Sequence, residues 1–460
     1  MTVKKFDAII VGSGQAGTPL AFKFAGEGKK VAFIEKEHWG GTCLNVGCTP
    51  TKAYVASARR MWDAQHGIEL GVSIPEGVKI DLQKVKERKD ALIRKSYEGI
   101  AYGIKSSDNI IPYKGEASFT GFKTLEVNGE QIQAEHIFIN TGARPLIPEG
   151  FEEVDYLTNQ SILQLYELPE HLIIVGGSYI GLEFGQMFKR FGSKVTIIER
   201  NEQIIASEDD EISKSILKTL EEEGVEFRLN ATCISGKNNK DGTITVSVDC
   251  RKGAPEITGT HLLLAVGRTP NTDMLNFPAT GLSADKRGYL EVNDYLETSV
   301  PGIYALGDCN GKGAFTHTAY NDYEIVADNM FEGKDRKVSD RIITYALYVD
   351  PPLGRAGITK KEALSKGYNI LEAKMPMKRI ARAKEKGETK GLMNAIINAD
   401  TKEFLGAAVL GVGGDEIISS ILTLMYAKAP YTVFRDAVIP HPTIAELIPT
   451  ILESVKKISK

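Results

Sequence analysis

Two cysteines, Cys43 and Cys48, are the first residues whose types and spacing could do chemistry. They lie in the segment Gly-Gly-Thr-Cys-Leu-Asn-Val-Gly-Cys-Thr-Pro-Thr-Lys at positions 40–52. Pro50 suits the first position of a helix and Thr49 suits its cap, so we expect a helix to follow. The helix dipole favours a thiolate on Cys48 by roughly 0.3–1 kcal/mol, and by at most about 2 kcal/mol. That free energy lowers the thiol pKa by at most about one and a half units, so the sequence predicts a partly ionised, redox-active pair.

Two other interpretations of this pair are a buried, unreactive couple and one half of a metal site. Metal sites that use cysteine usually need a C-x2-C spacing with a second pair or with histidines. Cys233, Cys250 and Cys309 show no such spacing. We therefore expect no bound metal, and we interpret these three cysteines as ordinary small residues that are buried or partly exposed.

A nucleotide-binding pattern precedes the cysteines. An apolar run leads into Gly-Ser-Gly-Gln-Ala-Gly at positions 12–17, and Glu35 ends the next apolar run. Strand, G-x-G-x-x-G, helix and acid together form the fingerprint of a dinucleotide-binding βαβ unit. Gly12 allows the tight turn, Gly14 lets the backbone approach a pyrophosphate, and Gly17 lets the helix pack close to the strand. The pyrophosphate rests at the helix N-terminus, and Glu35 accepts hydrogen bonds from a ribose.

The same pattern occurs a second time. Gly-Gly-Ser-Tyr-Ile-Gly occupies positions 176–181, and Glu199 follows it at the spacing at which Glu35 follows the first loop. Ser178 replaces the middle glycine, which is the smallest change available where backbone meets phosphate. Two copies, each with strand, helix and acid in register, predict that the chain binds two nucleotides.

Beyond about residue 337 the pattern changes. Apolar runs near 395–397 and 405–410 are typical of hairpin strands, and 415–426 has a helical pattern. Shorter glycine segments after each copy of the fingerprint indicate crossings between a first domain and a second domain inserted into it. The predicted fold class is α/β, with two Rossmann-like nucleotide-binding domains and a C-terminal α+β domain. The predicted ranges are 1–145 and 266–336 for the first domain, 146–265 for the second and 337–460 for the third.

The composition excludes several classes of protein. A formal net charge of −4 over 460 residues gives no reason to expect nucleic acid or an acidic membrane as a partner. No apolar run approaches the roughly 18–20 residues of a membrane span. Five cysteines are an odd, low number for a secreted disulfide framework. Lys4 and Lys5 precede an apolar stretch, but Asp7 interrupts it, so we expect a strand there rather than a signal peptide. We therefore expect a cytoplasmic protein.

The motif at 40–52 resembles the most specific motif of the group I pyridine nucleotide–disulfide oxidoreductases. This family includes lipoamide dehydrogenase, glutathione reductase and mercuric reductase. Tyr-Ala-Leu-Gly-Asp at 304–308 resembles the family's second FAD segment, and His-Pro-Thr-Ile-Ala-Glu at 441–446 resembles its C-terminal motif. The resemblance covers essentially the whole chain. It implies that the first fingerprint holds FAD, that the second holds NAD(P)H, and that the third domain forms a homodimer.

The resemblance also implies catalytic roles. Cys48 is expected to be the sulfur beside the flavin, and Cys43 the interchange thiol that attacks the substrate. His441, oriented by Glu446, is expected to be the acid/base that serves Cys43 from the partner subunit. From the residues alone, His441 could equally be a turn residue, and its five-residue separation from Glu446 fits an orienting contact only loosely.

Further residues receive cofactor roles from the resemblance. Lys52 and Glu183 are expected to form an ion pair beside the flavin ring, and Tyr179 to cover the nicotinamide pocket. From the residues alone they could also be two solvated charges and a core side chain. We expect NADH rather than NADPH as the donor, because a charged Glu199 would repel a 2′-phosphate. The remaining implied contacts are Gly41, Thr42, Thr141, Gly142 and Asp308 for FAD, and Gly176, Ser178, Gly181 and Gly267 for the nicotinamide nucleotide.

Some features depart from the family pattern. Residues 454–460 lack the cysteines that bind metal in mercuric reductases, and no C-x-x-C domain precedes the fold, so we do not expect mercury reduction. The segments 313–323 and 446–450 resemble most closely a mercuric-reductase-like branch, to which metal-ion reduction and oxidative-stress defence are ascribed. Cys309 is unusual for the family. Lys378–Lys390 is rich in basic residues, and we interpret it first as a solvated surface and only secondarily as a means of steering substrate.

The predicted function is an FAD-dependent reductase. Electrons pass from NADH through FAD to a Cys43–Cys48 disulfide, and from there to a small-molecule disulfide or a metal ion. One alternative is dihydrolipoamide dehydrogenase, which runs in the other direction. Another is a flavoprotein redox sensor with slow turnover. The sequence does not name the acceptor, because its pocket is built from dispersed side chains.

Overall fold

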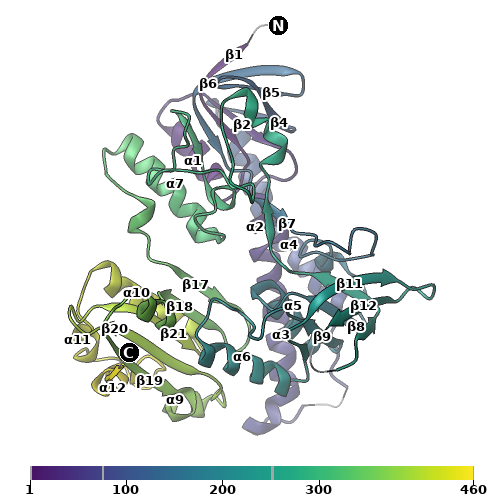
Figure 1. The fold of residues 1–460 in the computed structure, drawn as a ribbon, viewed down its shortest axis with the longest axis vertical. Helices are drawn as coiled ribbons and strands as arrows, with labels where there is room; N and C mark the ends of the chain where they lie inside the picture. The colour runs from purple at the N-terminus through teal and green to yellow at the C-terminus, as the bar shows by residue number, and fades with distance from the viewer. Residues whose placement is uncertain (1–2, 75–76, 250–252, 459–460) are drawn as a thin grey trace. The chain divides into compact units, whose positions relative to one another are not determined.

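The structure is a computed structural model that describes residues 3–74, 77–249 and 253–458 (Figure 1). The chain divides into two compact units. The first contains Met1–Ala53, Lys84–Leu146 and Gly267–Arg341, and the second contains Tyr54–Gln83, Ile147–Val266 and Ile342–Lys460. The second unit thus holds most of the predicted second domain together with the predicted third domain. The four predicted domain ranges stay predictions.

The first unit is built on a seven-stranded sheet. Its order is β3-β2-β1-β6-β5-β4, with β16 beside β6. The central strand β1 runs parallel to both β2 and β6, and its apolar side chains alternate between two cores. Ile9 and Val11 face one core, and Ala8 and Ile10 face the other. Burial on both faces explains why this segment is an almost continuous apolar run. The strands are β1 (Lys4–Val11), β2 (Val31–Glu35), β3 (Ile110–Lys114), β4 (Ala117–Gly121), β5 (Thr124–Val127), β6 (Glu130–Ile139) and β16 (Ile303–Ala305).

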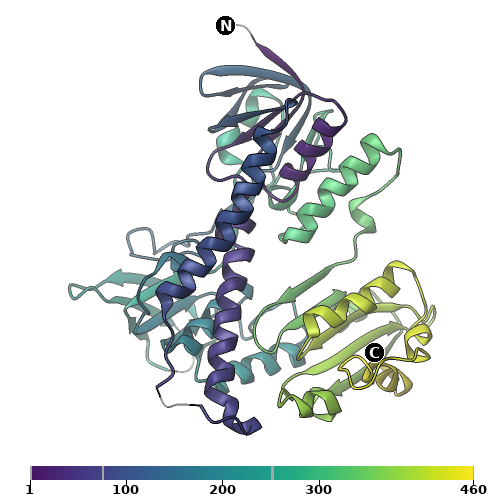
Figure 2. The ribbon, with the colours of Figure 1, turned by 180° about the vertical axis from the view of Figure 1, so that it is seen from behind.

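Helices α1 (Gly17–Gly26) and α7 (Thr316–Phe331) lie side by side in this unit (Figures 1 and 2). Both supply side chains to the core that contains Ala8 and Ile10. The short strands β7 (Ala143–Pro145) and β15 (Arg268–Pro270) pair antiparallel where the chain leaves and re-enters the unit. Two further long helices, α3 (Cys48–His66) and α4 (Leu82–Lys105), each have residues in both units.

The second unit contains a four-stranded sheet that is parallel throughout, in the order β10-β9-β8-β14. In this sheet β8 leads into α5 and then β9, which is the βαβ order that the second fingerprint predicts. A separate three-stranded antiparallel sheet has the order β11-β12-β13. The elements are β8 (His171–Val175), α5 (Tyr179–Phe191), β9 (Lys194–Ile198), α6 (Asp210–Glu222), β10 (Glu226–Arg228), β11 (Thr232–Asn238), β12 (Ile244–Asp249), β13 (Glu256–Gly259) and β14 (His261–Leu264).

The C-terminal part of the second unit is a six-stranded sheet in the order β17-β18-β21-β20-β19-β22. The predicted hairpin is confirmed, because β20 and β21 pair antiparallel. The predicted helix at 415–426 is also confirmed as α10, which packs on β18 and β21. The elements are β17 (Thr344–Leu347), β18 (Leu353–Gly357), α8 (Lys360–Ser365), β19 (Ile370–Pro376), α9 (Ala381–Glu385), β20 (Leu392–Asn398), β21 (Phe404–Leu410), α10 (Gly414–Tyr426), α11 (Thr432–Arg435), α12 (Leu447–Glu453) and β22 (Lys456–Ile458).

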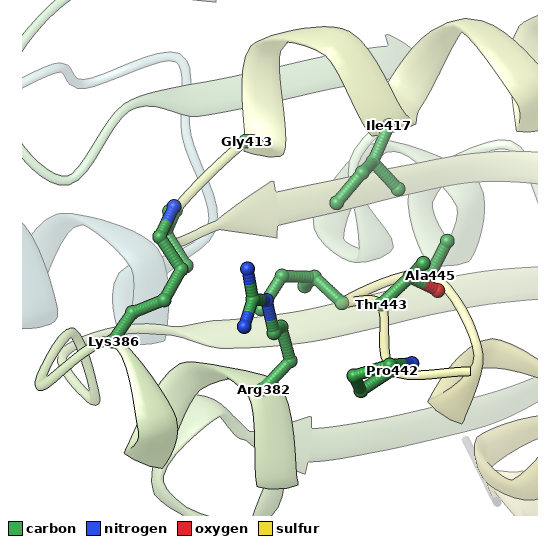
Figure 3. Close-up of a pocket in the computed structure, with 9 residues that line it drawn as sticks. Arg382, Lys386, Gly413, Ile417, Pro442, Thr443 and Ala445 are labelled. Atoms are coloured by element: carbon green, nitrogen blue, oxygen red, sulfur yellow. The ribbon is translucent and has the colours of Figure 1, made fainter. Parts of the chain in front are cut away.

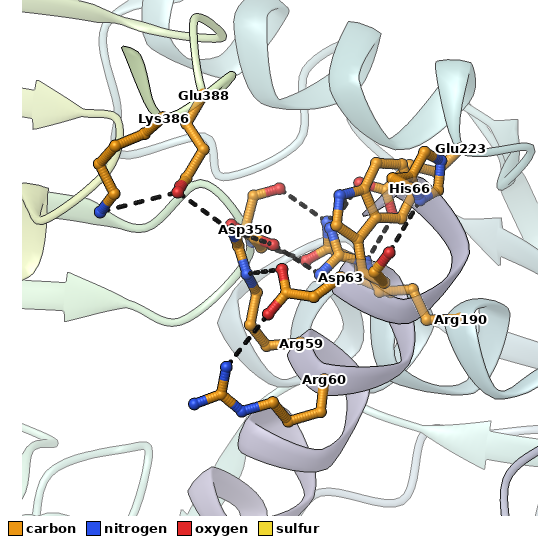
Figure 4. A network of polar contacts seen from close by, with 11 residues as sticks. Arg59, Arg60, Asp63, His66, Arg190, Glu223, Asp350, Lys386 and Glu388 are labelled. Atoms are coloured by element: carbon orange, nitrogen blue, oxygen red, sulfur yellow. Dashed lines mark hydrogen bonds and ion pairs between the residues drawn. The ribbon is translucent and has the colours of Figure 1, made fainter. Parts of the chain in front are cut away.

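A buried charge network joins three parts of the second unit (Figure 4). Arg190, at the end of α5, contacts Glu223 through Nη2 at 2.8 Å and Asp350 through Nη1 at 2.6 Å. Arg59 of α3 contacts the other oxygen of Asp350 at 2.7 Å. Since Arg190 and Glu223 are almost fully buried, these charges stabilise the fold only because each has a partner.

Within the described ranges, no helix combines the length and the apolar character that a membrane span requires.

Candidate active site

The first fingerprint forms a turn whose glycines are sterically required. Gly12 has φ +100°, and a Cβ there would lie 2.2 Å from the carbonyl oxygen of Asn140. A Cβ on Gly17 would lie 2.1 Å from the carbonyl oxygen of Gly12. Glu35 ends β2 and accepts hydrogen bonds from the backbone N–H of Ser13 at 3.0 Å and from its hydroxyl at 2.6 Å. The acid therefore lies directly against the glycine loop.

The second fingerprint repeats this geometry. Gly176 has φ +116°, and its Cβ would lie 2.4 Å from the carbonyl oxygen of Ala265. A Cβ on Gly181 would lie 1.9 Å from the carbonyl oxygen of Gly176. Glu199 accepts a hydrogen bond from the N–H of Gly177 at 2.8 Å. Both loops are thus tight backbone turns at a helix N-terminus with a carboxylate alongside, which suits two dinucleotides.

The structure explains why a serine replaces the middle glycine in only one copy. A Cβ on Gly14 would lie 2.8 Å from Oδ1 of Asn140, and that oxygen accepts a hydrogen bond from the N–H of Gly17 at 2.9 Å. In the second copy, Ala265 stands where Asn140 stands in the first and has no side chain that reaches the loop. Ser178 is therefore tolerated. The paired difference between Asn140 and Ala265 was a signal in the sequence that the spacing of the glycines alone did not reveal.

Other expected FAD contacts have geometry that fits a bound cofactor. The buried Thr141 Oγ1 has no hydrogen-bond partner within the described part of the chain. Gly142 has φ +67°, and open space lies beside its Cα. Burial raises the pKa of the Asp308 carboxyl, and Arg268, 3.5 Å away, acts in the opposite direction. These residues fit FAD because they offer an unpaired hydroxyl, an uncovered backbone and a carboxylate.

Cys43 and Cys48 lie in the first unit, on two successive helices. Cys43 belongs to α2 (Gly41–Val46), which the sequence did not predict, and α3 begins at Cys48 itself. The prediction that Thr49 caps this helix and that Pro50 is its first residue is therefore wrong by two positions. Both residues lie inside the first turn, where the missing N–H of proline is tolerated. The prediction that Cys48 lies at a helix N-terminus is confirmed.

One hydroxyl contacts both sulfurs. Thr316, the first residue of α7, donates a hydrogen bond to Sγ of Cys43 at 2.9 Å, and its Oγ1 lies 3.3 Å from Sγ of Cys48. The two cysteines are free thiols, with Cys43 partly buried and Cys48 exposed. Sequence analysis did not predict a contact of Thr316 with the cysteines, because Thr316 lies far along the chain from them and has no spacing relation to them.

The electrostatics of the pair are unequal. The hydrogen bond with Cys48 raises the pKa of the Cys43 thiol, and burial raises it further, whereas the hydroxyl of Thr316 acts in the opposite direction. When the pair holds a single proton, that proton therefore stays on Cys43. Cys48, at the helix N-terminus, then carries the negative charge.

The cysteine segment lies against the first fingerprint, as its position in the sequence predicts. The N–H of Gly40 donates to Oγ of Ser13 at 3.1 Å. A Cβ on Gly41 would lie 2.8 Å from Cα of Gly14. The thiol pair and the first nucleotide loop therefore belong to one site, and Thr42 stands between Gly41 and Cys43 in α2.

His441 and Glu446 form a direct contact in the second unit. Nδ1 of His441 lies 2.8 Å from Oε2 of Glu446, and the histidine side chain is 77% exposed. The orienting contact between the two residues, which the resemblance implies, is thus present. Because Nδ1 contacts Glu446, Nε2 is the ring nitrogen that is left for a reacting group.

A hollow of about 350 Å³ lies beside the residues that follow His441 (Figure 3). Arg382 and Lys386 extend into it from the α9 region, opposite Pro442 and Thr443. These basic residues belong to the segment 378–390, and both have acidic neighbours. Arg382 lies 3.0 Å from Glu385, and Lys386 lies 3.7 Å from Glu388. The charge of the segment is thus partly neutralised, in line with its interpretation as a solvated surface.

The remaining expected residues lie where the motifs place them. Lys52 is in the first turns of α3. Glu183 is buried in α5 and accepts a hydrogen bond from the N–H of Tyr348 at 3.0 Å. The ion pair between Lys52 and Glu183 stays a prediction. Gly267 has φ +138° and open space beside it. Cys309 is fully buried, as expected, whereas Cys250 and the side chain of Cys233 lie outside the described residues.

Two dinucleotide loops with a thiol pair beside one of them define a nucleotide-dependent thiol oxidoreductase. Residues 6–322 match the family model described as pyridine nucleotide-disulphide oxidoreductase. Residues 343–451 match the dimerisation domain of the same family. The chain belongs to the pyridine nucleotide–disulfide oxidoreductase family. It is a flavoenzyme whose cofactors are FAD and NAD(P)H.

Relatives of known name agree with this assignment. A probable pyridine nucleotide-disulfide oxidoreductase, RclA, of Escherichia coli strain K12 is 34% identical over 99% of this chain and 100% of its own length. The mercuric reductase of Staphylococcus aureus is 32% identical over 96% of this chain and 81% of its own. A dihydrolipoyl dehydrogenase of Thermus scotoductus is 32% identical over 99% of this chain and 98% of its own.

A solved structure is similar over nearly the whole chain. It is the Cu(II) complex of the HOCl-induced flavoprotein disulfide reductase RclA from Escherichia coli. Its TM-score is 0.88 at 32% sequence identity, and the match covers 99% of this chain and 100% of that one. The α/β fold class, with FAD- and NAD-binding domains and a dimerisation domain, is thereby confirmed.

Proposed function

We propose that this flavoenzyme reduces a small-molecule disulfide or a metal ion with electrons from NADH, through the Cys43–Cys48 pair. The observation that carries the proposal is the placement of both sulfurs on the hydroxyl of Thr316, with Cys48 at the N-terminus of α3. This arrangement stabilises a negative charge on the pair, which a thiol needs in order to act as nucleophile or metal ligand.

Electron transfer and proton transfer are assigned to different groups of the enzyme. FAD, when bound, accepts two electrons from the nicotinamide and supplies them to the cysteine disulfide. Reduction of that disulfide also takes up two protons and gives two thiols. The proton that stays on Cys43 must leave before its sulfur attacks an acceptor. We assign its removal to His441 of a partner subunit in a homodimer, with Glu446 holding Nδ1 so that the other nitrogen is free.

The nucleotide contacts complete the proposal. Lys52 and Glu183 form an ion pair beside the flavin ring, and Tyr179 covers the nicotinamide pocket. Glu199 reads the ribose of NADH. Backbone and side chains of the first unit hold FAD, namely Gly12, Gly14, Gly17, Glu35, Gly41, Thr42, Thr141, Gly142 and Asp308. The second loop holds the nicotinamide nucleotide with Gly176, Ser178 and Gly181, and Gly267 contributes from the crossing segment.

The relatives support a metal ion as one class of acceptor. One of them is named a mercuric reductase, and one similar solved structure is a Cu(II) complex. Thiolates are soft ligands that favour Cu(I), the product of a one-electron reduction of Cu(II). Two thiols also supply the two electrons that reduction of a small disulfide needs. We therefore propose that this pair can reduce either a metal ion whose reduced form binds thiolate, such as Cu(II), or a small disulfide.

The test is a screen of electron acceptors with NADH in excess. Lipoamide, glutathione disulfide, Cu(II), Hg(II), quinone and oxygen are each added to the holoenzyme, and NADH oxidation is followed. We expect rapid, saturable turnover with at least one metal ion or disulfide. Slow turnover with all six would favour a redox sensor instead. Fast reduction of NAD⁺ by dihydrolipoamide, with slow metal and disulfide reduction, would favour a dihydrolipoamide dehydrogenase.

The two cysteines must behave differently if the roles are right. Alkylation of the reduced enzyme should label Cys43 first. The variant Cys43→Ser should keep the absorbance that a thiolate gives beside flavin, and Cys48→Ser should lose it. The reverse pattern would show that the two roles are exchanged.

A further inference from the structure

We propose that Tyr345, anchored by Glu208 and Arg355, is a positioning residue that holds Tyr179 in its ligand-free position and thereby weakens NADH binding. The inference rests on the proposed function in one respect, namely that Tyr179 covers the nicotinamide pocket. It adds three residues to that site, all from the second unit, to which no sequence motif points.

The anchor is a buried ion pair. Arg355 lies in β18, all of whose residues are buried, and its Nε is 3.1 Å from Oε1 of Glu208. Its Nη2 contacts the other oxygen of Glu208 and also lies 3.2 Å from Asp209. The side chain of Glu208 is completely buried. Breaking a buried pair leaves an uncompensated charge, so neither Glu208 nor Arg355 is free to move.

Tyr345 is fixed to this anchor. It lies directly opposite Arg355 across the antiparallel pair of β17 and β18. Its hydroxyl donates a hydrogen bond to Oε1 of Glu208. Burial raises the pKa of the Tyr345 phenol, and the charge of Glu208 raises it further. The phenol therefore keeps its proton and remains a donor to Glu208.

Tyr179 contacts Tyr345 edge to face. Their ring centroids are 5.4 Å apart and the ring planes are inclined by 82°. The hydroxyl of Tyr179 lies 3.4 Å from Oγ of Ser207, the residue just before Glu208. Both of these contacts are therefore made to groups that the Arg355–Glu208 pair holds in place.

The two tyrosines differ in their freedom to move. Tyr345 is buried, whereas Tyr179 is partly exposed at the start of α5, within the second glycine loop. The close packing of Gly176 and Gly181 fixes the backbone of that loop, so only the side chain of Tyr179 can turn. A nicotinamide that displaces this ring must break its edge contact with Tyr345. Aromatic pairs of this geometry are worth enough to change a binding constant about two- to tenfold.

The experiment measures NADH binding and flavin reduction separately by rapid mixing of the holoenzyme. Tyr345→Leu removes the ring contact, and Tyr345→Phe keeps the ring but removes the hydroxyl, with its hydrogen bonds to Glu208 and Tyr179. Each is made with Tyr179 intact and in a Tyr179→Ala background. Tyr431→Leu is the matched control, because Tyr431 and Tyr345 are each 8% exposed in the same unit.

We expect Tyr345→Leu to lower the Kd for NADH about two- to tenfold, with the limiting rate of flavin reduction unchanged. Tyr345→Phe should produce a smaller decrease in the same direction, and Tyr431→Leu none. In the Tyr179→Ala background, neither Tyr345 variant should change the Kd for NADH. If Tyr345 had a purely structural role, its variants would change the Kd in both backgrounds. Only variants that retain their full FAD content enter the comparison.

Two results would overturn the inference in distinguishable ways. If Tyr179→Ala changes NADH binding but the Tyr345 variants have no effect, or have the same effect in both backgrounds, Tyr179 covers the pocket without help from Tyr345. If Tyr179→Ala itself changes neither NADH binding nor flavin reduction, the proposed role of Tyr179 is wrong, and the role of Tyr345 falls with it.

Discussion

Thr316 shows how a single residue can control the reactivity of a thiol pair. A hydroxyl has only one hydrogen to donate, yet Thr316 lies within hydrogen-bond distance of both Cys43 and Cys48. It can therefore donate to whichever sulfur carries the charge. A hydrogen bond to a charged group is stronger than one between neutral groups, so Thr316 favours the ionised state of the pair as a whole.

We predict that Thr316→Val raises the pH at which the thiolate forms. The hydroxyl lowers the pKa of Cys43, and its loss should shift the titration of the reduced pair upward by about one pH unit. The measurement is the rate of thiol alkylation against pH. Thr316→Ser keeps the hydroxyl and should titrate like the wild type. Identical profiles for Val and wild type would show that the hydroxyl does not stabilise the thiolate.

Glu199 should decide which nicotinamide nucleotide is used. Its carboxylate is held on both sides, by the N–H of Gly177 at 2.8 Å and by the side chain of Asn201 at 2.6 Å. It therefore cannot turn away from a 2′-phosphate. Like charges brought together cost several kcal/mol, so kcat/KM for NADH should exceed that for NADPH by at least about tenfold. Glu199→Gln should reduce this ratio.

Arg200 provides the control for this prediction. It follows Glu199 directly but is exposed, and Arg200→Ala should leave the preference unchanged. If the wild type clearly prefers NADPH and Arg200→Ala loses this preference, then Arg200 rather than Glu199 determines which nucleotide is used.

The positions of single residues could be predicted from the sequence where these residues belong to a local motif. The glycines of both loops and the acids Glu35 and Glu199 lie as their spacing indicates, because turn geometry and strand pairing are local. Thr316 was not predictable, because it meets the cysteines only through the fold. The sequence alone did not explain why serine is accepted at position 178. The structure explains it, because Asn140 contacts the first turn and Ala265 contacts the second.

Helices and strands, like single residues, were predictable where a local pattern encodes them and not where contacts distant in the sequence do. Long apolar strands and the amphipathic α10 were predicted from their periodicity. The helix α2, which carries Cys43, spans only Gly41–Val46 and buries only Leu44, so it has no repeating pattern to detect. It begins beside the first nucleotide loop, where the N–H of Gly40 donates to Ser13. Gly47 separates it from α3, at a place where a Cβ would lie 2.9 Å from the carbonyl oxygen of Thr42.

The charge network around Asp350 links α3 and α5 to the loop between β17 and β18, and it makes stability depend on pH. Burial raises the pKa of the Asp350 carboxyl, but Arg190 and Arg59 outweigh burial, so the net shift is downward from the usual 3.8. A carboxyl with a lowered pKa in the folded state contributes stability above its unfolded pKa. That contribution is lost as the pH falls through the folded pKa.

We predict that Asp350→Asn lowers the free energy of unfolding at pH 7 by roughly 1–3 kcal/mol. The difference from the wild type should shrink as the pH falls below about 3.8. Urea unfolding at several pH values measures both effects. The control is Asp273→Asn, whose ion pair with Arg144 is about half exposed and should contribute less than about 1 kcal/mol. Equal losses in the two variants would contradict the role of the buried network.

At the scale of the whole molecule, the two copies of the fingerprint determined most of what could be predicted. Each copy encodes a parallel sheet with a nucleotide loop at one end, and both sheets are present. The pairing of β7 with β15 was not predicted, because it joins segments more than a hundred residues apart. The C-terminal domain carries no nucleotide motif. Its role in dimerisation was expected only from the family resemblance, and residues 343–451 match the family's dimerisation-domain model.

The catalytic groups of one proposed site come from distant parts of the chain. Cys43 belongs to the first compact unit and His441 to the second. A thiol that loses and regains a proton near neutral pH needs a base with a pKa near that pH, and histidine is the side chain whose ordinary pKa fits. We predict that His441→Ala lowers acceptor reduction about 10²–10⁴-fold. Flavin reduction by NADH should be almost unchanged, because it precedes the thiol step.

Sharing of the site between subunits is tested by mixing two inactive variants, Cys43→Ser and His441→Ala, and letting their subunits exchange. Each mixed dimer then contains one site with both residues intact and one site with neither, so activity should reappear. Differently tagged subunits show whether mixed dimers form. If they form and acceptor reduction remains absent, then Cys43 and His441 do not meet across the dimer, and the base must be sought in the same subunit as the thiol.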